Sequence, residues 1–125
     1  MVTGSCLCGR VRYEIVGAVK RTSHCHCTMC QKQHGAAFAS YANVASEAFS
    51  YTSGRESVAR YQSSPEVTRC FCQHCGSNLT WQMAQIDERI AVTLGTFDTP
   101  FEGVVTTELH LEDRASWLSH SHKES

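Results

Sequence analysis

The sequence predicts an all-β domain built from antiparallel strands, and three observations lead to this prediction. First, residues 10–16 alternate polar and apolar side chains, which places Val11, Tyr13 and Ile15 on one face of a strand. Second, seven further segments of strand length follow at close spacing, separated by turn residues. Third, helical periodicity is weak throughout the chain. Many short strands in regular succession are typical of an antiparallel sheet.

The expected elements follow one another with no linker or low-complexity tract between them. The expected strands cover residues 10–16, 36–41, 48–51, 57–61, 67–72, 78–83, 89–94 and 106–111. Residues 28–34 are expected to form one or two helical turns, and residues 114–119 a terminal turn. Residues 119–125 form a polar tail, in which His120 and His122 are read as part of a frayed end and not as a further site.

Composition limits the classes of function. At 125 residues, the chain is expected to be one domain over residues 1–125, large enough to bury a core without disulfides. The formal net charge of −1 gives no general reason to bind nucleic acid or an anionic membrane. No apolar run reaches the ~18 residues of a membrane span, and residues 1–5 lack the features of a secretory signal. We therefore expect a soluble, cytoplasmic protein.

All eight cysteines fall in three clusters: Cys6-Leu7-Cys8, Cys25-His26-Cys27-Thr28-Met29-Cys30 and Cys70-Phe71-Cys72-Gln73-His74-Cys75. Such short spacings are typical of metal ligands, and closely spaced cysteines make strained disulfides. A reducing compartment, in which thiols coordinate metal or react, also disfavours a disulfide framework.

Four of these cysteines form a complete ligand set for zinc. Residues i and i+2 of a strand point to the same face, so Cys6 and Cys8 are expected to direct two sulfurs at one ion. Cys72 and Cys75 do the same on a tight turn, because Gly76 can adopt the left-handed conformation that the turn requires. Four thiolates close the tetrahedral shell, which predicts a structural zinc site that contributes to folding.

Cys25, Cys27 and Cys30 supply only three thiolates. Three protein ligands leave a fourth position for water or substrate, as in catalytic zinc sites. Four nearby residues could instead close this site, namely His24, His26, His34 and Cys70. Cys70 could also have one of two other roles. It could compete with the ligands of the four-thiolate site, or it could be a small buried apolar residue.

Three motifs in this order resemble those of the glutathione-dependent formaldehyde-activating enzyme family, which includes centromere protein V. The first runs from Gly4-Ser5-Cys6-Leu7-Cys8-Gly9 to Glu14, the second is the Cys25–Cys30 stretch followed by Gly35 and Phe38, and the third is Phe71-Cys72-Gln73-His74-Cys75-Gly76-Ser77. The resemblance covers residues 4–117. Cys70 lies outside the family pattern, and the chain is close to the bare domain in length.

The resemblance implies a compact β-tent fold with two zinc ions. It assigns Cys6, Cys8, Cys72 and Cys75 to a structural ion, and Cys25, Cys27 and Cys30 to a catalytic one. It also implies a carbon–sulfur lyase activity that joins glutathione to formaldehyde as S-hydroxymethylglutathione. The partners would then be a small thiol such as glutathione and a small aldehyde, with no nucleic acid or membrane.

The mechanism expected from these residues is attack of a zinc-held thiol on an aldehyde carbon. His26 and His34 are close enough in sequence to be candidate proton donors, although a histidine beside a metal more often orients a ligand than reacts. Two features could contribute to a substrate pocket, the aromatic residue Trp81 and a weak basic cluster that contains Arg21. The alternative function is a non-catalytic, zinc-stabilised binding module. Exposed sheet edges are compatible with a homodimer.

Overall fold

The computed structural model describes residues 1–118, apart from the side chains of residues 86 and 87, and confirms the all-β class. The strands are β1 Val2–Ser5, β2 Arg12–Ile15, β3 Arg21–Cys25, β4 Ala39–Ala45, β5 Phe49–Ser53, β6 Val58–Ser64, β7 Val67–Cys72, β8 Asn78–Met83, β9 Ile86–Thr93 and β10 Thr107–Leu109. The α-helix is α1 Thr28–His34, and the 3-10 turns are η1 Ser46–Ala48, η2 Arg55–Ser57, η3 Leu94–Thr96 and η4 Leu111–Asp113.

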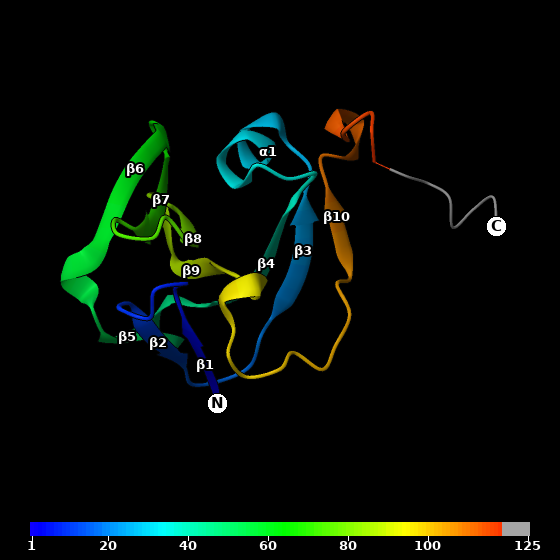
Figure 1. Ribbon diagram of the computed structural model, residues 1–125. Helices are drawn as coiled ribbons and strands as arrows, with labels where there is room; N and C mark the ends of the chain where they lie inside the picture. The colour runs from blue at the N-terminus through cyan, green and yellow to red at the C-terminus, as the bar shows by residue number, and fades with distance from the viewer. Residues whose placement is uncertain (119–125) are drawn as a thin grey trace.

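The strands form two sheets. The small sheet has the order β1-β2-β5, and the large sheet has the order β10-β3-β4-β9-β8-β7-β6. Figure 1 shows the two ends of the large sheet standing apart, with β6 at one side, β3 and β10 at the other, and α1 at the top of the view. The small sheet lies below β7, β8 and β9 in the same view.

The main apolar core lies between the two sheets. Tyr13 and Ile15 of β2 pack against Val44 of β4 and Val92 of β9, and all four are at most 1% exposed. The apolar residues of the alternating pattern at residues 10–16 thus include the inward face of β2. Each fully buried side chain of this size contributes about 1.5–3 kcal/mol of transfer free energy. Two further clusters of buried apolar residues each contain cysteines.

One strand pair departs from the antiparallel prediction. β10 pairs with β3 in parallel, with Leu109 opposite Cys25. A parallel partner needs a long connection, and residues 97–106 provide it. Thr22 fixes this connection, because its hydroxyl donates to the carbonyl oxygen of Val104 and accepts from the backbone N–H of Thr106.

The predicted bounds match the observed bounds best where sequence pattern and tertiary environment agree. Residues 28–34, 67–72 and 78–83 adopt the expected elements with the expected bounds. The strand predicted at residues 36–41 begins instead at Ala39, because Gly35 ends α1 in the left-handed conformation. β1 and β3 are strands that the sequence pattern does not predict. Residues 119–125, including His120 and His122, lie outside the described residues.

No helix within residues 1–118 combines the length and the apolar character needed to cross a membrane.

The close approach of two loops at Gly54 gives a stability prediction. Gly54 has φ 76°, and a Cβ atom there would overlap the carbonyl oxygen of Arg10. We expect Gly54→Ala to lower the free energy of unfolding by about 2–5 kcal/mol, because left-handed backbone costs ~1–2 kcal/mol and the overlap ~1–3 kcal/mol more. Gly35→Ala is the matched control, with φ 59° and no neighbour within 4 Å. Urea denaturation measures both variants, and equal losses would contradict the prediction.

Candidate metal centres

Two groups of cysteine thiols come together in the structure. We call Cys6, Cys8, Cys72 and Cys75 the four-thiol group, and Cys25, Cys27 and Cys30 the three-thiol group. In each group all sulfurs lie within 4.8 Å of one another. Both groups could therefore hold a metal ion.

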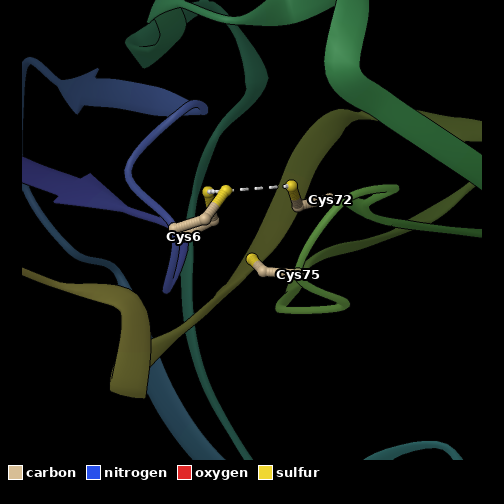
Figure 2. A group of neighbouring side chains, drawn as sticks. Cys6, Cys72 and Cys75 are labelled. Carbon is tan, nitrogen blue, oxygen red and sulfur yellow. Dashed lines mark hydrogen bonds between the residues drawn. The ribbon is translucent and has the colours of Figure 1, made fainter.

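The four-thiol group joins two loops that are distant in sequence. Figure 2 shows the side chain of Cys6 pointing from the N-terminal loop toward Cys72, which ends β7, and Cys75, which lies in the turn between β7 and β8. The Sγ of Cys8 is 3.6 Å from that of Cys6 and 3.9 Å from that of Cys72. Cys6 and Cys72 are buried, whereas Cys8 is exposed.

Tight turns bring these sulfurs together. As predicted, Gly76 is left-handed with φ 81°, and its N–H donates to the carbonyl oxygen of Cys72 at 2.8 Å. The prediction that Cys6 and Cys8 share a strand face is wrong, because β1 ends at Ser5. The two cysteines lie instead on a turn closed by the hydrogen bond from Gly9 N–H to the carbonyl oxygen of Cys6.

The geometry of the four-thiol group fits zinc. With Zn–S bonds of ~2.3 Å, the sulfurs of a regular tetrahedral site lie about 3.8 Å apart. The two measured separations, 3.6 and 3.9 Å, bracket this value. The backbone N–H of Val11 also donates to Cys6 Sγ at 3.3 Å, an interaction that favours a thiolate.

The three-thiol group lies where β3 meets α1. Cys25 ends β3, and Cys27 is the N-cap residue of α1, where its sulfur accepts the backbone N–H of Cys30 at 3.3 Å. Cys30 lies in the first turn of α1 and is only 1% exposed. The strand, the cap and the helical turn therefore each supply one sulfur to the group.

All three sulfur-bearing residues line one cavity of about 420 Å³. Its walls come from β3, α1, β4, β6, β7, β8, β9 and the β10–η4 segment. The charged and aromatic lining residues are Arg21, Tyr41, Arg69, Trp81, His110 and Asp113. Small-molecule sites commonly occupy ~300–1,000 Å³. The three-thiol group thus borders a space large enough for a ligand.

A buried guanidinium group beside this cavity favours the presence of a negative charge there. Arg69 is 3% exposed, and within residues 1–118 no carboxylate forms an ion pair with it. Its Nη1 donates to Gln33 Oε1 at 2.7 Å and to Cys30 Sγ at 3.6 Å. A buried cation without a counter-charge is costly, and a thiolate at Cys30 supplies one.

The thiols of this group influence one another strongly. The hydrogen bond with Cys25 and the guanidinium of Arg69 lower the pKa of Cys30 to about 5, against the effect of burial. The same contact with Cys30, together with burial, raises the pKa of Cys25 above its ordinary value. One thiolate is therefore favoured even before a cation binds, and a divalent metal would stabilise all three.

None of the residues considered as a fourth ligand joins the three-thiol group among the described residues. His26 Nε2 lies 2.7 Å from the Glu108 carboxylate, and His24 Nδ1 lies 3.1 Å from the same side chain. The ring of His24 stacks against Phe38. His34 Nε2 lies 3.3 Å from the Tyr41 hydroxyl, and burial lowers its pKa.

Cys70 belongs to neither thiol group. As expected from alternation, it lies on the same face of β7 as Cys72, since both are next to Tyr51 and Val58. However, its sulfur does not lie within 4.8 Å of all the sulfurs of the four-thiol group. Cys70 is half-buried in a separate cleft of about 320 Å³ that also contains Arg55 and Arg60.

Sequence reasoning missed Tyr41, Arg69, His110 and Asp113 as cavity residues. Trp81 and Arg21, which it named as possible contributors to a substrate pocket, line this cavity. The alternation along β7 could have identified Arg69, because Cys70 and Arg69 must face opposite sides of the sheet. No local signal identifies His110. The group of His110, Glu112 and Asp113 is exposed, and exposed acidic groups are common without an ion.

Comparison with known proteins found a matching sequence family and a similar fold. The sequence model of a family described as glutathione-dependent formaldehyde-activating enzyme matches residues 1–113. No curated protein matches the chain. The crystal structure of a Rhodobacter sphaeroides protein is similar, with a TM-score of 0.69 at 21% identity over 85% of this chain and 98% of the other. At that identity, the likeness concerns the fold alone.

The contact between Arg69 and Cys30 predicts a measurable shift in reactivity. In protein freed of metal, we expect alkylation of Cys30 by iodoacetamide to have its pH midpoint near 5, because the thiolate is the reacting form. Arg69→Met should move this midpoint upward, since it removes a positive charge. Arg60→Met, on the exposed face of β6, should leave it unchanged. Peptide mass spectrometry measures the extent of Cys30 alkylation at each pH. Identical midpoints in the wild-type protein and both variants would refute the role of Arg69.

Proposed function

The chain belongs to the glutathione-dependent formaldehyde-activating enzyme family, and on this premise we propose that it is a zinc-dependent enzyme of the carbon–sulfur lyase type. Its reaction would form or break the adduct between a small thiol and a small aldehyde, such as S-hydroxymethylglutathione. We propose Cys25, Cys27 and Cys30 as the ligands of a catalytic ion, and the four-thiol group as the site of a structural ion.

The observation that carries this proposal is the contrast between the two thiol groups. The four-thiol group has a complete set of protein ligands and lies between two loops. The three-thiol group has one ligand fewer among the described residues and borders the 420 Å³ cavity. A site that is incomplete where it meets a cavity is the arrangement expected of a reactive centre.

A zinc ion held by three thiolates supplies a fourth coordination position that keeps a substrate thiol in its thiolate form. The gain from deprotonation alone is modest, because a thiol of pKa ~8.5 is already a few per cent thiolate at pH 7. Most of the acceleration must therefore come from holding the aldehyde beside the sulfur. The walls of the cavity, which include Trp81 and Tyr41, would provide that confinement.

Two guanidinium groups suit an anionic thiol. Arg69 is fixed by hydrogen bonds to Ser63 and Gln33, so its role is to balance the charge of the cysteine thiolates. Arg21 is exposed and lines the same cavity, where it is available to a substrate carboxylate. Glutathione carries such carboxylates.

Cobalt substitution tests whether the three-thiol site accepts a thiol. We expect two cobalt ions per chain, one of which changes its visible absorption in a saturable manner when glutathione is added. The change should be absent when S-methylglutathione, which has no free thiol, replaces glutathione. If glutathione changes the visible absorption of neither cobalt ion, the result contradicts the proposal and favours the zinc-stabilised binding module.

Serine substitutions separate the two proposed ions. Cys27→Ser should remove one zinc equivalent and lower adduct formation by about a hundredfold or more, because thiol activation and orientation are both lost, while the fold is retained. Cys72→Ser should remove the other equivalent and destabilise the fold, because metal binding there contributes to folding. Cys70→Ser is the control and should keep both ions. Elemental analysis, thermal denaturation and turnover measure these effects, and normal turnover by Cys27→Ser would refute the catalytic assignment.

A further inference from the structure

Adduct formation requires a group that moves a proton. The thiol loses a proton when it becomes a nucleophile, and the carbonyl oxygen gains one when the carbon–sulfur bond forms. Besides the thiols, the titratable residues that line the cavity are Arg21, Tyr41, Arg69, His110 and Asp113. Imidazole exchanges protons near neutral pH, whereas guanidinium, phenol and carboxylate groups ordinarily do so far from neutrality. Burial also raises the pKa of Tyr41 further. Of these five residues, His110 therefore has the best-suited chemistry.

The two histidines that the sequence favoured as proton donors are held elsewhere. His26 is 2% exposed, and its Nε2 is engaged with Glu108. Its Nδ1 is buried without a hydrogen-bond partner among the described residues. His34 is engaged with the hydroxyl of Tyr41. Neither residue lines the cavity of the three-thiol group.

The parallel pairing of β10 with β3 brings the end of β10, which His110 follows, next to the end of β3 at Cys25. Leu109 lies opposite Cys25, and its carbonyl oxygen accepts the backbone N–H of His26 at 2.9 Å. His110 is therefore the residue that follows immediately after this contact. The side chain of Gln31 donates to the carbonyl oxygens of both His26 and Asp113, which holds the turn after His110 against the three-thiol loop.

His110 also has an unusual backbone conformation. With φ 59° and ψ 43°, it is the one non-glycine residue of the described chain that has a positive φ. Such a conformation is costly for a side chain with a Cβ, and strained residues of this kind cluster at functional sites. Here the left-handed turn ends β10 and leaves the imidazole at the edge of the cavity. Its Nδ1 lies 3.6 Å from a carboxylate oxygen of Glu112.

We propose that His110 is the catalytic acid–base residue of the reaction, an inference that rests on the proposed function. Neutral His110 takes the proton of the substrate thiol. The thiolate sulfur then forms a bond to the aldehyde carbon, and the electron pair of the broken C=O π bond moves to oxygen. His110 returns its proton to that oxygen, which gives the hydroxymethyl thioether and regenerates neutral imidazole. The reverse sequence releases thiol and aldehyde.

Two substitutions test this role without introducing backbone strain. Asparagine and glycine both tolerate positive φ, so His110→Asn and His110→Gly should fold normally. We expect His110→Asn to form adduct about a hundredfold more slowly, within the range typical of acid–base residues, and to change the pH profile of the rate. Added imidazole should partly restore the rate of His110→Gly. His74→Asn, at an exposed histidine outside the cavity, is the matched control.

A second measurement does not depend on turnover. Diethyl pyrocarbonate modifies accessible histidines, and peptide mass spectrometry locates them. S-Methylglutathione bound in the cavity should slow the modification of His110 and leave that of His74 unchanged. Equal modification of His110 with and without this ligand would place the imidazole away from the substrate and overturn the inference.

The outcomes separate this inference from the function on which it rests. If the wild-type protein forms and breaks no adduct, the proposed function is wrong, and the role of His110 fails with it. If the wild-type protein is active and His110→Asn matches it in rate and pH profile, the inference alone is wrong. Loss of activity in His110→Gly without rescue by imidazole, accompanied by loss of bound zinc, would also overturn it.

Discussion

The pairing of β3 on both of its edges is the constraint on which the three-thiol site depends. β4 binds one edge in antiparallel fashion, and β10 binds the other in parallel. This double pairing fixes the direction in which Cys25 leaves the sheet, and with it the start of α1, where Cys27 and Cys30 lie. It also brings a segment more than 80 residues later in the chain to the same place. The cavity exists because these pairings occur together.

Charge balance is the second constraint. The large sheet buries the guanidinium of Arg69 against a cysteine sulfur and two neutral side chains, with no carboxylate in an ion pair among the described residues. Burying a cation in this manner is tolerable only if negative charge accompanies it. Thiolates supply that charge, and a metal ion with three thiolate ligands carries a net charge of −1. Arg69 and such a site would neutralise each other.

The two thiol groups differ in what surrounds them more than in their cysteine spacing. Cys72 and Cys75 face Cys6 and Cys8, so two loops complete one ligand set (Figure 2). Cys25, Cys27 and Cys30 face a cavity whose opposite walls come from Arg69 on β7 and Trp81 on β8. The same strand alternation places Cys70 on the other side of the sheet. Similar cysteine motifs therefore form different kinds of site, depending on which residues the sheet places opposite them.

The sequence alone determined the features that local periodicity and backbone chemistry encode. Alternation indicated the inward face of β2, and segment length with flanking turn residues indicated the bounds of β7 and β8. The glycine after Cys75 indicated the turn of the four-thiol group. Cysteine spacing was enough to separate a set of four from a set of three.

Tertiary structure alone decided the rest. β3 reads as Arg-Thr-Ser-His-Cys, with no apolar alternation, and is a strand because β4 and β10 bind both of its edges. The parallel direction of β10, the exclusion of Cys70, and the positions of Arg69 and His110 likewise depend on which strands lie side by side. Those contacts join residues from 14 to about 85 positions apart, and a pattern with a period of two or four residues carries no information about them.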